Sequence, residues 1–338
     1  MRILVDGMGG DHAPAEVVKG CAEATKFTEH TIILIGDETL LKKELDKYPK
    51  AKKKIEVVHA SEQITMEDAP VRAIRSKKDS SMVKGLNMVK NGEADIFISA
   101  GNSGALMAGG IFILGRIRGV ERPAIAATYP VLGKGVCLLV DSGANAECRA
   151  NNLLEFAVMG NIYMEKVLGK SNPRVGLVNI GVEESKGTAM LQSAYQLLRD
   201  HGGFNFIGNV EAREVPLGGC DVAVCDGFVG NILLKTTEGM GKSVSNLLKA
   251  RLMENVRSKM GALVLAPQLA AIKKEFDYSE YGGAPILGVR GAVVKMHGSS
   301  KANAVKNTIL KAIPYAEMDV VATMSEAIAA VEEETIVE

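Results

Sequence analysis

The chain has 338 residues, of which 47% are hydrophobic, so it can bury a large core and suits one large α/β unit or two interleaved ones. Its 40 basic residues balance its 40 acidic residues, and no basic cluster with interleaved aromatics occurs, so nucleic acid is not an expected partner. Five cysteines without C-x-x-C spacing predict reduced, buried thiols in a cytoplasmic protein. No apolar run reaches membrane-spanning length.

The first predicted strand, residues 3–5, ends at Asp6 and runs into a turn that contains Gly9 and Gly10. Glycines allow bare backbone N–H groups to reach the carboxyl edge of a sheet, where open α/β folds bind ligands. A tight strand-to-helix connection that binds nothing explains this one turn equally well.

A helix is predicted to begin at Pro14, with Asp11 placed as its cap, because proline in a first helical turn loses no hydrogen bond. Apolar runs predict further strands at 31–36 and 55–59, with a helix over 38–47 between them.

Glycine-rich breaks follow apolar strands repeatedly along the chain. They lie at residues 99–104, 141–145, 179–181, 225–231 and 297–300. Because the breaks lead into helical patterns, we expect their loops to gather on one edge of a sheet and to form an anion site.

Alternating strands and helices predict an α/β fold in three layers, a mainly parallel sheet with helices on both faces. Longer helices are expected over 151–168 and 187–201, and a third over 80–90. The whole chain, 1–338, is interpreted as one unit of two interleaved subdomains whose boundary lies near 128–134.

An apolar stretch over 261–272 is too short to cross a bilayer, and Pro267 divides it. We therefore expect a projecting helical hairpin over 240–276. Leu263, Val264, Leu265 and Leu269 are its candidate membrane contacts, and burial in a dimer interface is the competing interpretation.

Seven motifs taken together resemble the acyl-acyl carrier protein:phosphate acyltransferase family of bacterial phospholipid synthesis. They are DGMGGDHAP, SAGNSGA, DSGAN, NIGVEESKG, CDGFVGN, GGAPILGV and HGSS, and the resemblance covers residues 1 to about 312. Two positions depart from the family's usual pattern: Gly7 replaces the alanine of DAMGGD, and Ser142 replaces the valine of DVGAN.

The resemblance implies a fold like that of the isocitrate and isopropylmalate dehydrogenases. It implies transfer of a long-chain fatty acyl group from an acyl carrier protein thioester to inorganic phosphate, without cofactor or metal. It further implies a homodimer at an anionic membrane surface, which would pass acyl phosphate to a membrane acyl phosphate:glycerol-3-phosphate acyltransferase. Acyl carrier proteins are acidic, so Arg251, Arg257 and Lys259 are candidates for contact with the carrier.

Three residues are the catalytic candidates, of which Lys186 and Asn231 rest on the resemblance more than on spacing. Lys186 would clamp phosphate electrostatically, and Asn231 would donate to the oxyanion. His297 and His12 are the only histidines in glycine loops, so His297, or alternatively His12, would act as a proton donor. A structural role stays open for each: a surface ion pair for Lys186, a cap on a helix over 232–235 for Asn231, and a structural hydrogen bond for His297.

The remaining candidates form a cradle for phosphate and the acyl thioester. They are Asp6, Gly9, Gly10, Ser80, Ser81, Asn102, Ser103, Gly104 and Asp226. A metal cluster of Asp6, Asp11, Asp141 and Asp226 is a less favoured interpretation of the strand-end aspartates.

Two nucleotide-site motifs are incomplete. The segment 239–243 resembles a P-loop, but Thr236 stands where glycine is required and the segment lies in a helical pattern. The opening turn has His12 in place of the third glycine of a dinucleotide fingerprint. Three further functions are compatible with the sequence: a phosphate acyltransferase that uses coenzyme A thioesters, a metal-dependent dehydrogenase of similar architecture, and a non-catalytic membrane-surface scaffold.

Overall fold

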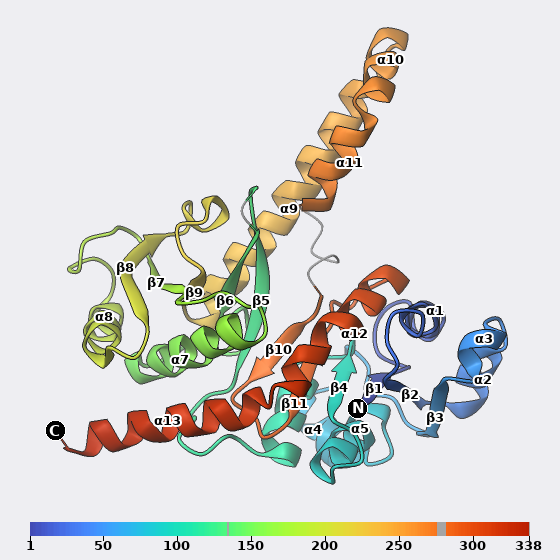
Figure 1. The fold of residues 1–338 in the computed structure, drawn as a ribbon, viewed down its shortest axis with the longest axis horizontal. Helices are drawn as coiled ribbons and strands as arrows, with labels where there is room; N and C mark the ends of the chain where they lie inside the picture. The colour runs from blue at the N-terminus through green and yellow to red at the C-terminus, as the bar shows by residue number, and fades with distance from the viewer. Residues whose placement is uncertain (134, 276–281, 338) are drawn as a thin grey trace.

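The computed structural model describes residues 1–133, 135–275 and 282–337 (Figure 1). One sheet of eleven strands runs through the molecule in the order β3-β2-β1-β4-β11-β10-β5-β6-β9-β7-β8. The strands are β1 (Arg2–Asp6), β2 (Thr31–Gly36), β3 (Ile55–His59), β4 (Ile96–Ser99), β5 (Ala124–Val131), β6 (Gly135–Val140), β7 (Arg174–Asn179), β8 (Asn205–Glu211), β9 (Val222–Val224), β10 (Ala284–Leu287) and β11 (Ala292–Lys295).

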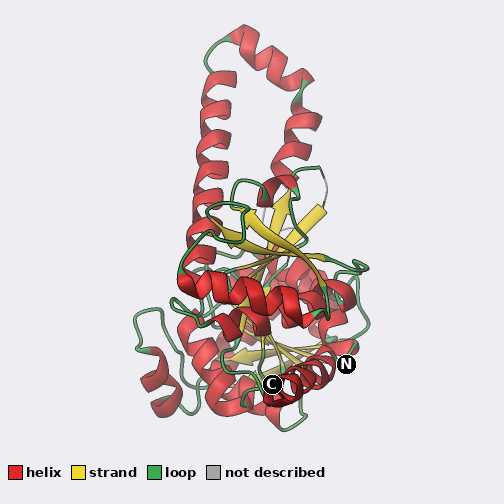
Figure 2. Ribbon diagram, turned by 90° about the vertical axis from the view of Figure 1, so that its left-hand side faces the viewer, coloured by secondary structure: helices red, strands yellow, loops and turns green. Residues whose placement is uncertain are grey.

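Helices cover the sheet and also extend from it (Figures 1 and 2). The α-helices are α1 (Ala15–Ala24), α2 (Glu38–Leu45), α3 (Pro49–Lys52), α4 (Pro70–Ser76), α5 (Ser81–Lys90), α6 (Ser103–Gly109), α7 (Ala150–Lys166), α8 (Ala189–His201), α9 (Gly227–Leu252), α10 (Val256–Val264), α11 (Ala266–Glu275), α12 (Ala302–Glu317) and α13 (Val320–Val337). A π-helical turn, Gly110–Leu114, continues α6, and a 3₁₀ turn, Val215–Leu217, precedes β9.

Alternate residues of the first strands enter separate hydrophobic cores, which confirms the predicted three layers. Ile3 and Val5 of β1 belong to the core that includes residues of α1 and α12, whereas Leu4 belongs to the core formed with α5 and α6. Successive side chains of a strand point to opposite faces, so both faces of this half of the sheet are covered.

The predicted strands 31–36 and 55–59 coincide with β2 and β3. The predicted cap of α1 is wrong: Pro14 itself occupies the N-cap position, and Asp11 instead donates its backbone N–H to the carbonyl of Gly298 at 2.9 Å. Tertiary contact with the loop after β11 thus takes the place of a local capping bond.

The sheet is mainly parallel, as predicted, but three adjacent pairings at its centre are antiparallel: β11 with β10, β10 with β5, and β5 with β6. These reversals turn β6, β9 and β7 against the direction of β1, β4 and β11. The expectation that all glycine loops share one edge is therefore wrong. The loops form two sets at opposite edges.

The predicted subdomain boundary falls on the end of β5 and the turn before β6, and position 134 lies outside the described residues. On the far side of this turn, α7 is buried along most of its length and packs against α8 and α13. The helix predicted over 232–235 is in fact the much longer α9, which begins at Gly227 because Asp226 caps it.

The helices α9, α10 and α11 project from the body as a hairpin (Figures 1 and 2). The first arm is α9, the tip is α10, and α11 returns; α10 ends at Val264 and Pro267 lies in the first turn of α11, as the breaking role of proline predicts. Position 276 lies outside the described residues. The P-loop-like segment 239–243 is helical, being part of α9, and within the described residues no helix is long and apolar enough to cross a membrane.

The start of α9 provides a test of this packing. A Cβ added at Gly230 would lie 1.9 Å from the carbonyl oxygen of Asp141, so the backbone must move. We expect Gly230→Ala to lower the free energy of unfolding by about 3 kcal/mol, at the upper end of typical overpacking costs. Urea denaturation followed by circular dichroism measures this change.

Gly239→Ala in the same helix is the matched control, because beyond the adjacent backbone of α9 itself no described atom lies within 4 Å of the added Cβ. That variant should gain about 0.5–1 kcal/mol from the lower backbone entropy of its unfolded chain. Equal stability of the two variants would contradict the close approach of α9 to Asp141.

Candidate functional site

Asp6 organises the opening glycine turn. Its buried carboxylate accepts the hydroxyl of Ser99 at 2.7 Å and the backbone N–H of Met8 at 3.1 Å. A Cβ at Gly9 would lie 2.6 Å from the Asp6 carboxylate and 2.7 Å from the backbone nitrogen of Gly101, so only glycine fits. Burial raises the pKa of Asp6, and hydrogen bonds from Ser99 and Ser81 oppose that rise.

A small cavity lies beside this turn. It has a volume of about 120 Å³ and is lined by Gly10, Asp11, Gly101, Asn102 and residues 63–67. Gly10 has a φ of +98°, a conformation that glycine adopts without strain. The cavity therefore lies between the turns after β1 and β4, which are two of the predicted loops. Its size and polar lining suit a small polar group.

The cradle residues around β4 divide into buried and exposed groups. Asn102 caps α6 by accepting the N–H of Ala105 at 3.0 Å, and its amide also faces the backbone carbonyls of Thr65, Met66 and Asp68 as a donor. Ser80 is buried and caps α5, as predicted, and Ser81 is buried beside Asp6. Ser103 and Gly104 are exposed in the first turn of α6.

The second set of loops repeats the arrangement around Asp141. This buried carboxylate accepts backbone N–H groups of Gly143, Ala144 and Asn145 at 2.7–3.1 Å. Burial raises the pKa of Asp141, opposed by these bonds. Asp226 caps α9 by accepting the N–H of Val229 at 2.8 Å. An aspartate thus fixes the turn after β6 as Asp6 fixes the turn after β1.

Lys186 lies in the loop between β7 and α8, just before the N-terminus of that helix, as predicted. Its Nζ lies 4.0 Å from a carboxylate oxygen of Glu183, and both side chains are about half exposed or more. The amide of Asn179 donates to the backbone carbonyl of Lys186 at 3.2 Å, which holds the loop. The structure therefore contains both the helix-terminus placement and the surface ion pair considered from the sequence.

The helix α9 brings the two sets of loops together. Asn231 packs on the turn after β6, since a Cβ at Gly143 would lie 3.4 Å from the Cβ and Oδ1 of Asn231. Lys235 is one turn further along the same face, and its Nζ lies 3.5 Å from Nε2 of His297 in the loop after β11. Asn231 does not cap a helix, because it lies inside α9.

His297 is oriented by its own loop. Its Nδ1 accepts the backbone N–H of Ser299 at 3.2 Å, and the Ser299 hydroxyl lies 2.8 Å away. Burial and the neighbouring charge of Lys235 lower the pKa of His297. Nε2 is the ring nitrogen that faces Lys235, and the tautomer sets which of the two ring nitrogens donates.

The sequence patterns did not single out two lysines of this site. Lys235 contacts His297, and the charge of Lys295 also helps to lower the pKa of that ring. Lys295 ends a β-strand two residues before His297 of the motif HGSS, and Lys235 follows Asn231 by four residues, so spacing relative to motif residues could have identified them.

The four aspartates considered as a metal cluster are distributed over the two sets of loops. Asp6 and Asp141 accept hydrogen bonds within their turns, Asp226 caps α9, and Asp11 bonds to Gly298 through its backbone N–H. Across the described ranges, no group of three or more His, Cys, Asp or Glu side chains is placed to hold a metal ion.

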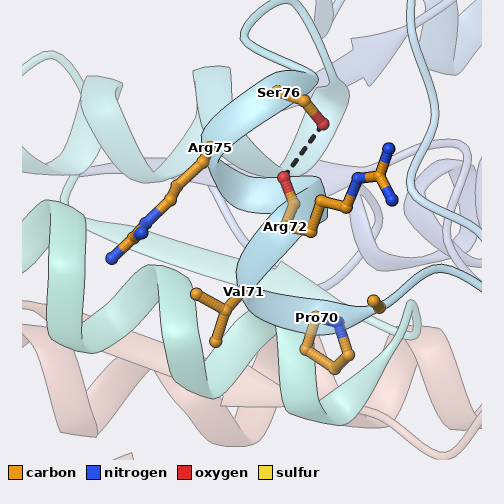
Figure 3. A pocket seen from close by; sticks show the side chains of 6 residues that line it. Pro70, Val71, Arg72, Arg75 and Ser76 are labelled. Atoms are coloured by element: carbon orange, nitrogen blue, oxygen red, sulfur yellow. Dashed lines mark hydrogen bonds between the residues drawn. The ribbon is translucent and has the colours of Figure 1, made fainter.

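A larger hollow of about 620 Å³ lies on α4, lined by Ala69, Pro70, Val71, Arg72, Arg75 and Ser76 (Figure 3). In Figure 3 Val71 and Arg75 extend toward one side of the helix and Arg72 toward the other. Pro70 contacts the first turn of α6, since a Cβ at Gly104 would lie 2.8 Å from its Cγ. The hollow flanks the first set of loops, and neither Asp6 nor His297 lines it.

The sequence matches the family model of the fatty acid synthesis protein over residues 1–323. The chain belongs to this family. It is 56% identical to a phosphate acyltransferase of Alkaliphilus oremlandii over 97% of each chain, and 50% identical to one of Clostridioides difficile over 99% of this chain and 98% of the relative. The resemblance seen in the motifs is confirmed, and the protein is an enzyme of the transferase class.

Solved structures of other enzymes share the fold of this family member. A phosphotransacetylase from Streptococcus pyogenes superposes with a TM-score of 0.62 at 17% identity and covers 94% of both chains. A 4-hydroxythreonine-4-phosphate dehydrogenase from Klebsiella pneumoniae gives 0.55 at 11% identity, covering 94% of this chain and 99% of that one. The predicted dehydrogenase-like architecture is confirmed.

Proposed function

We propose that the protein transfers a long-chain fatty acyl group from an acyl carrier protein thioester to inorganic phosphate, giving acyl phosphate for phospholipid synthesis. The supporting observation is the meeting of Asn231, Lys235 and His297 between two sets of glycine-rich loops. The names of relatives at about half identity support acyl transfer to phosphate. The acyl carrier and the lipid pathway rest on the motif resemblance.

The proposed reaction needs no covalent enzyme intermediate. An oxygen of hydrogen phosphate attacks the thioester carbonyl carbon and forms a C–O bond, and the C–S bond breaks as the tetrahedral intermediate collapses. The proton of hydrogen phosphate ends on the leaving sulfur, so the products are acyl phosphate and a free thiol. The enzyme must position the reactants and stabilise the oxyanion.

We assign Asn231 as the oxyanion donor, because its amide is exposed and held against the turn after β6. Lys186 is assigned as an electrostatic clamp at the N-terminus of α8. His297 is assigned as the proton donor: it gives a proton to the leaving sulfur and takes up the proton of hydrogen phosphate, so the ring ends in the protonation state in which it began. These roles divide the site between α9 and the loops at both sheet edges.

Coenzyme A thioesters are the second candidate donor, and the fold shared with phosphotransacetylases favours testing them. A metal-dependent dehydrogenase is the third candidate function, since dehydrogenases also share the architecture, and a non-catalytic membrane-surface scaffold is the fourth. Thiol release with each donor separates the two acyltransferase candidates from the other two, and reduction of a nicotinamide cofactor separates a dehydrogenase from a scaffold.

The hairpin exposes two apolar surfaces that suit two different neighbours. We define the stem surface as Met240, Val244, Leu247 and Leu248 of α9, which recur at helical spacing and are 44–60% exposed. At the tip, Leu263 and Val264 are 76% and 77% exposed and Leu265 is 49% exposed, whereas Leu269 is only partly exposed. We propose that the stem surface forms the homodimer and that the tip contacts an anionic membrane surface peripherally.

The first functional prediction is that thiol release depends on phosphate. Purified enzyme with acyl-acyl carrier protein should release thiol only when inorganic phosphate is present, because phosphate is the nucleophile. EDTA and a nicotinamide cofactor should leave the rate unchanged, and acyl coenzyme A should be the poorer donor. Release that is independent of phosphate, or lost with EDTA and restored by a divalent ion, would refute the proposal.

The second prediction concerns Asn231. Loss of one preorganised oxyanion donor lowers turnover by roughly a hundredfold, about 3 kcal/mol. Asn231→Ala should therefore reduce kcat by that factor with an unchanged circular dichroism spectrum. Asn246→Ala, an exposed asparagine on the same helix, is the matched control and should keep wild-type kcat. Normal turnover of Asn231→Ala would remove Asn231 from the mechanism.

The third prediction separates tip from stem. Wild-type protein should co-sediment with anionic liposomes at low salt, because apolar side chains and Arg257 and Lys259 of α10 meet the headgroups together. Leu263→Glu/Leu265→Glu should abolish sedimentation and leave the protein dimeric and active. Val244→Glu/Leu247→Glu should instead dissociate the dimer, as measured by analytical ultracentrifugation. A monomeric tip variant would place the dimer interface at the tip.

A further inference from the structure

The helix α4 is amphipathic and turns a basic face to solvent. Ala73 and Ile74 are buried in the hydrophobic core formed with α5 and α6, whereas Arg72 and Arg75 are exposed. The segment 70–78 contains four basic residues and no acidic one. Because the buried side anchors α4 to the body, the basic side is presented in a fixed orientation.

Most of this positive charge is not neutralised within the chain. Lys77 pairs with Asp68 at 2.6 Å, which accounts for one of the four basic residues. Arg72, Arg75 and Lys78 form no ion pair with any other residue that the structure describes. The face therefore carries positive charge that a negatively charged partner can neutralise.

Apolar side chains lie beside the two arginines. The guanidinium of Arg75 lies over the exposed ring of Phe112, 5.4 Å from its centroid. Val71, which extends to the same side of α4 as Arg75 in Figure 3, is exposed as well. Arginine and aromatic side chains are enriched at protein interfaces relative to the rest of the surface, and lysine is depleted. The composition of this face is thus typical of a surface that binds another protein.

Short contacts link this face to the site. Four residues before Pro70 of the hollow on α4, Met66 lines the small cavity beside the opening turn. A Cβ at Gly298 would lie 3.3 Å from the Cε of Met66, so Met66 also touches the loop after β11. His297 is the neighbour of Gly298 in that loop. A partner docked on α4 therefore lies next to residues that contact the loop of the assigned proton donor.

The basic residues that the sequence offers for carrier contact lie further along the hairpin. Arg251 is 20 residues beyond Asn231 on α9, which corresponds to about 30 Å along a helix. Its guanidinium also lies 3.5 Å from a carboxylate oxygen of Glu254. Arg257 and Lys259 belong to α10, at the tip of the hairpin (Figure 1). A carrier bound at the tip would have to bring its thioester back along this length.

We propose that α4 is the docking surface for the acidic acyl carrier. Arg72 and Arg75 pair with its carboxylates, and Val71 and Phe112 contact its apolar side chains. This inference rests on the proposed function and names the face to which the acyl donor binds. Charge complementarity identifies the occupant, because the carrier is acidic and the face is basic.

Charge reversal on α4 tests the docking surface. Arg72→Glu/Arg75→Glu should lower kcat/KM for acyl-acyl carrier protein by roughly tenfold to a hundredfold, the range for lost arginine contacts at the centre of an interface. Long-chain acyl pantetheine, a thioester without the protein, should keep its kcat/KM in this variant, which also shows that the variant is folded.

Lys50→Glu/Lys53→Glu is the matched control. These two exposed lysines are also three residues apart, on α3 and its C-cap, so the variant has the same change in charge at another surface. It should keep the wild-type kcat/KM for both donors.

Ionic strength separates charge pairing from a structural role. The Debye length falls from about 10 Å at 0.1 M salt to about 3 Å at 1 M, so the wild-type kcat/KM for the carrier substrate should fall as salt is added. The neutral variant Arg72→Gln/Arg75→Gln should lose most of this dependence, and Lys50→Gln/Lys53→Gln should keep it. A variant that is only destabilised would keep the salt dependence of the wild type, which would contradict pairing at α4.

A binding measurement needs no turnover. By fluorescence anisotropy, labelled holo acyl carrier protein should bind wild type and Lys50→Glu/Lys53→Glu alike, and Arg72→Glu/Arg75→Glu roughly tenfold or more weakly. If no donor releases thiol and this difference is still seen, the proposed reaction fails and the docking surface stands.

Three outcomes would overturn the inference. The first is unchanged carrier binding and kcat/KM in Arg72→Glu/Arg75→Glu. The second is a loss confined to Arg257→Glu/Lys259→Glu, which would place the carrier at the tip. The third is an α4 variant that binds the carrier normally but no longer sediments with anionic liposomes, which would make α4 a membrane contact.

Discussion

The contact of α9 with both sheet edges is the constraint on which the site depends. The central antiparallel strands send the loops after β1, β4 and β11 to one edge and those after β6, β9 and β7 to the other. Asp226 fixes where α9 begins, and Gly230 allows the helix to approach Asp141 closely. Asn231 and Lys235 thereby touch one loop of each set.

Buried aspartates at strand ends give each edge a rigid turn. Asp6 and Asp141 are both desolvated, which raises the pKa of each, and both recover stability from hydrogen bonds to their carboxylates. A charged group in this position orders the backbone N–H groups of the following residues. Such turns are suited to preorganised recognition, because little reorganisation is needed when a ligand binds.

The hairpin and the body differ in the burial of their apolar side chains. In the body, apolar residues of the strands enter separate hydrophobic cores against which helices pack. Along α9 and α10, by contrast, large apolar side chains are exposed and recur at helical spacing. Large exposed apolar surfaces indicate contact with another protein or with lipid. The site and the proposed stem surface thus lie on one continuous helix, α9, and α10 carries the tip beyond it.

The sequence by itself determined the layered α/β fold, the strands β2 and β3, the family and the importance of the glycine turns after Asp6 and Asp141. These features depend on local periodicity and on motifs that a single segment carries. It also identified the N-terminus of α5, since Ser80 caps the helix that it precedes.

Only the tertiary structure decided strand direction and the partners of the site residues. Local patterns do not specify whether neighbouring strands run parallel, so the separation of the loops into two sets was not predictable. Asp11 does not cap α1 but donates its backbone N–H to the carbonyl of Gly298, nearly the whole chain away, and Lys235 contacts His297 across 62 residues of sequence. Such contacts depend on how distant elements pack, because the order of the strands, rather than their sequence spacing, sets which side chains are neighbours.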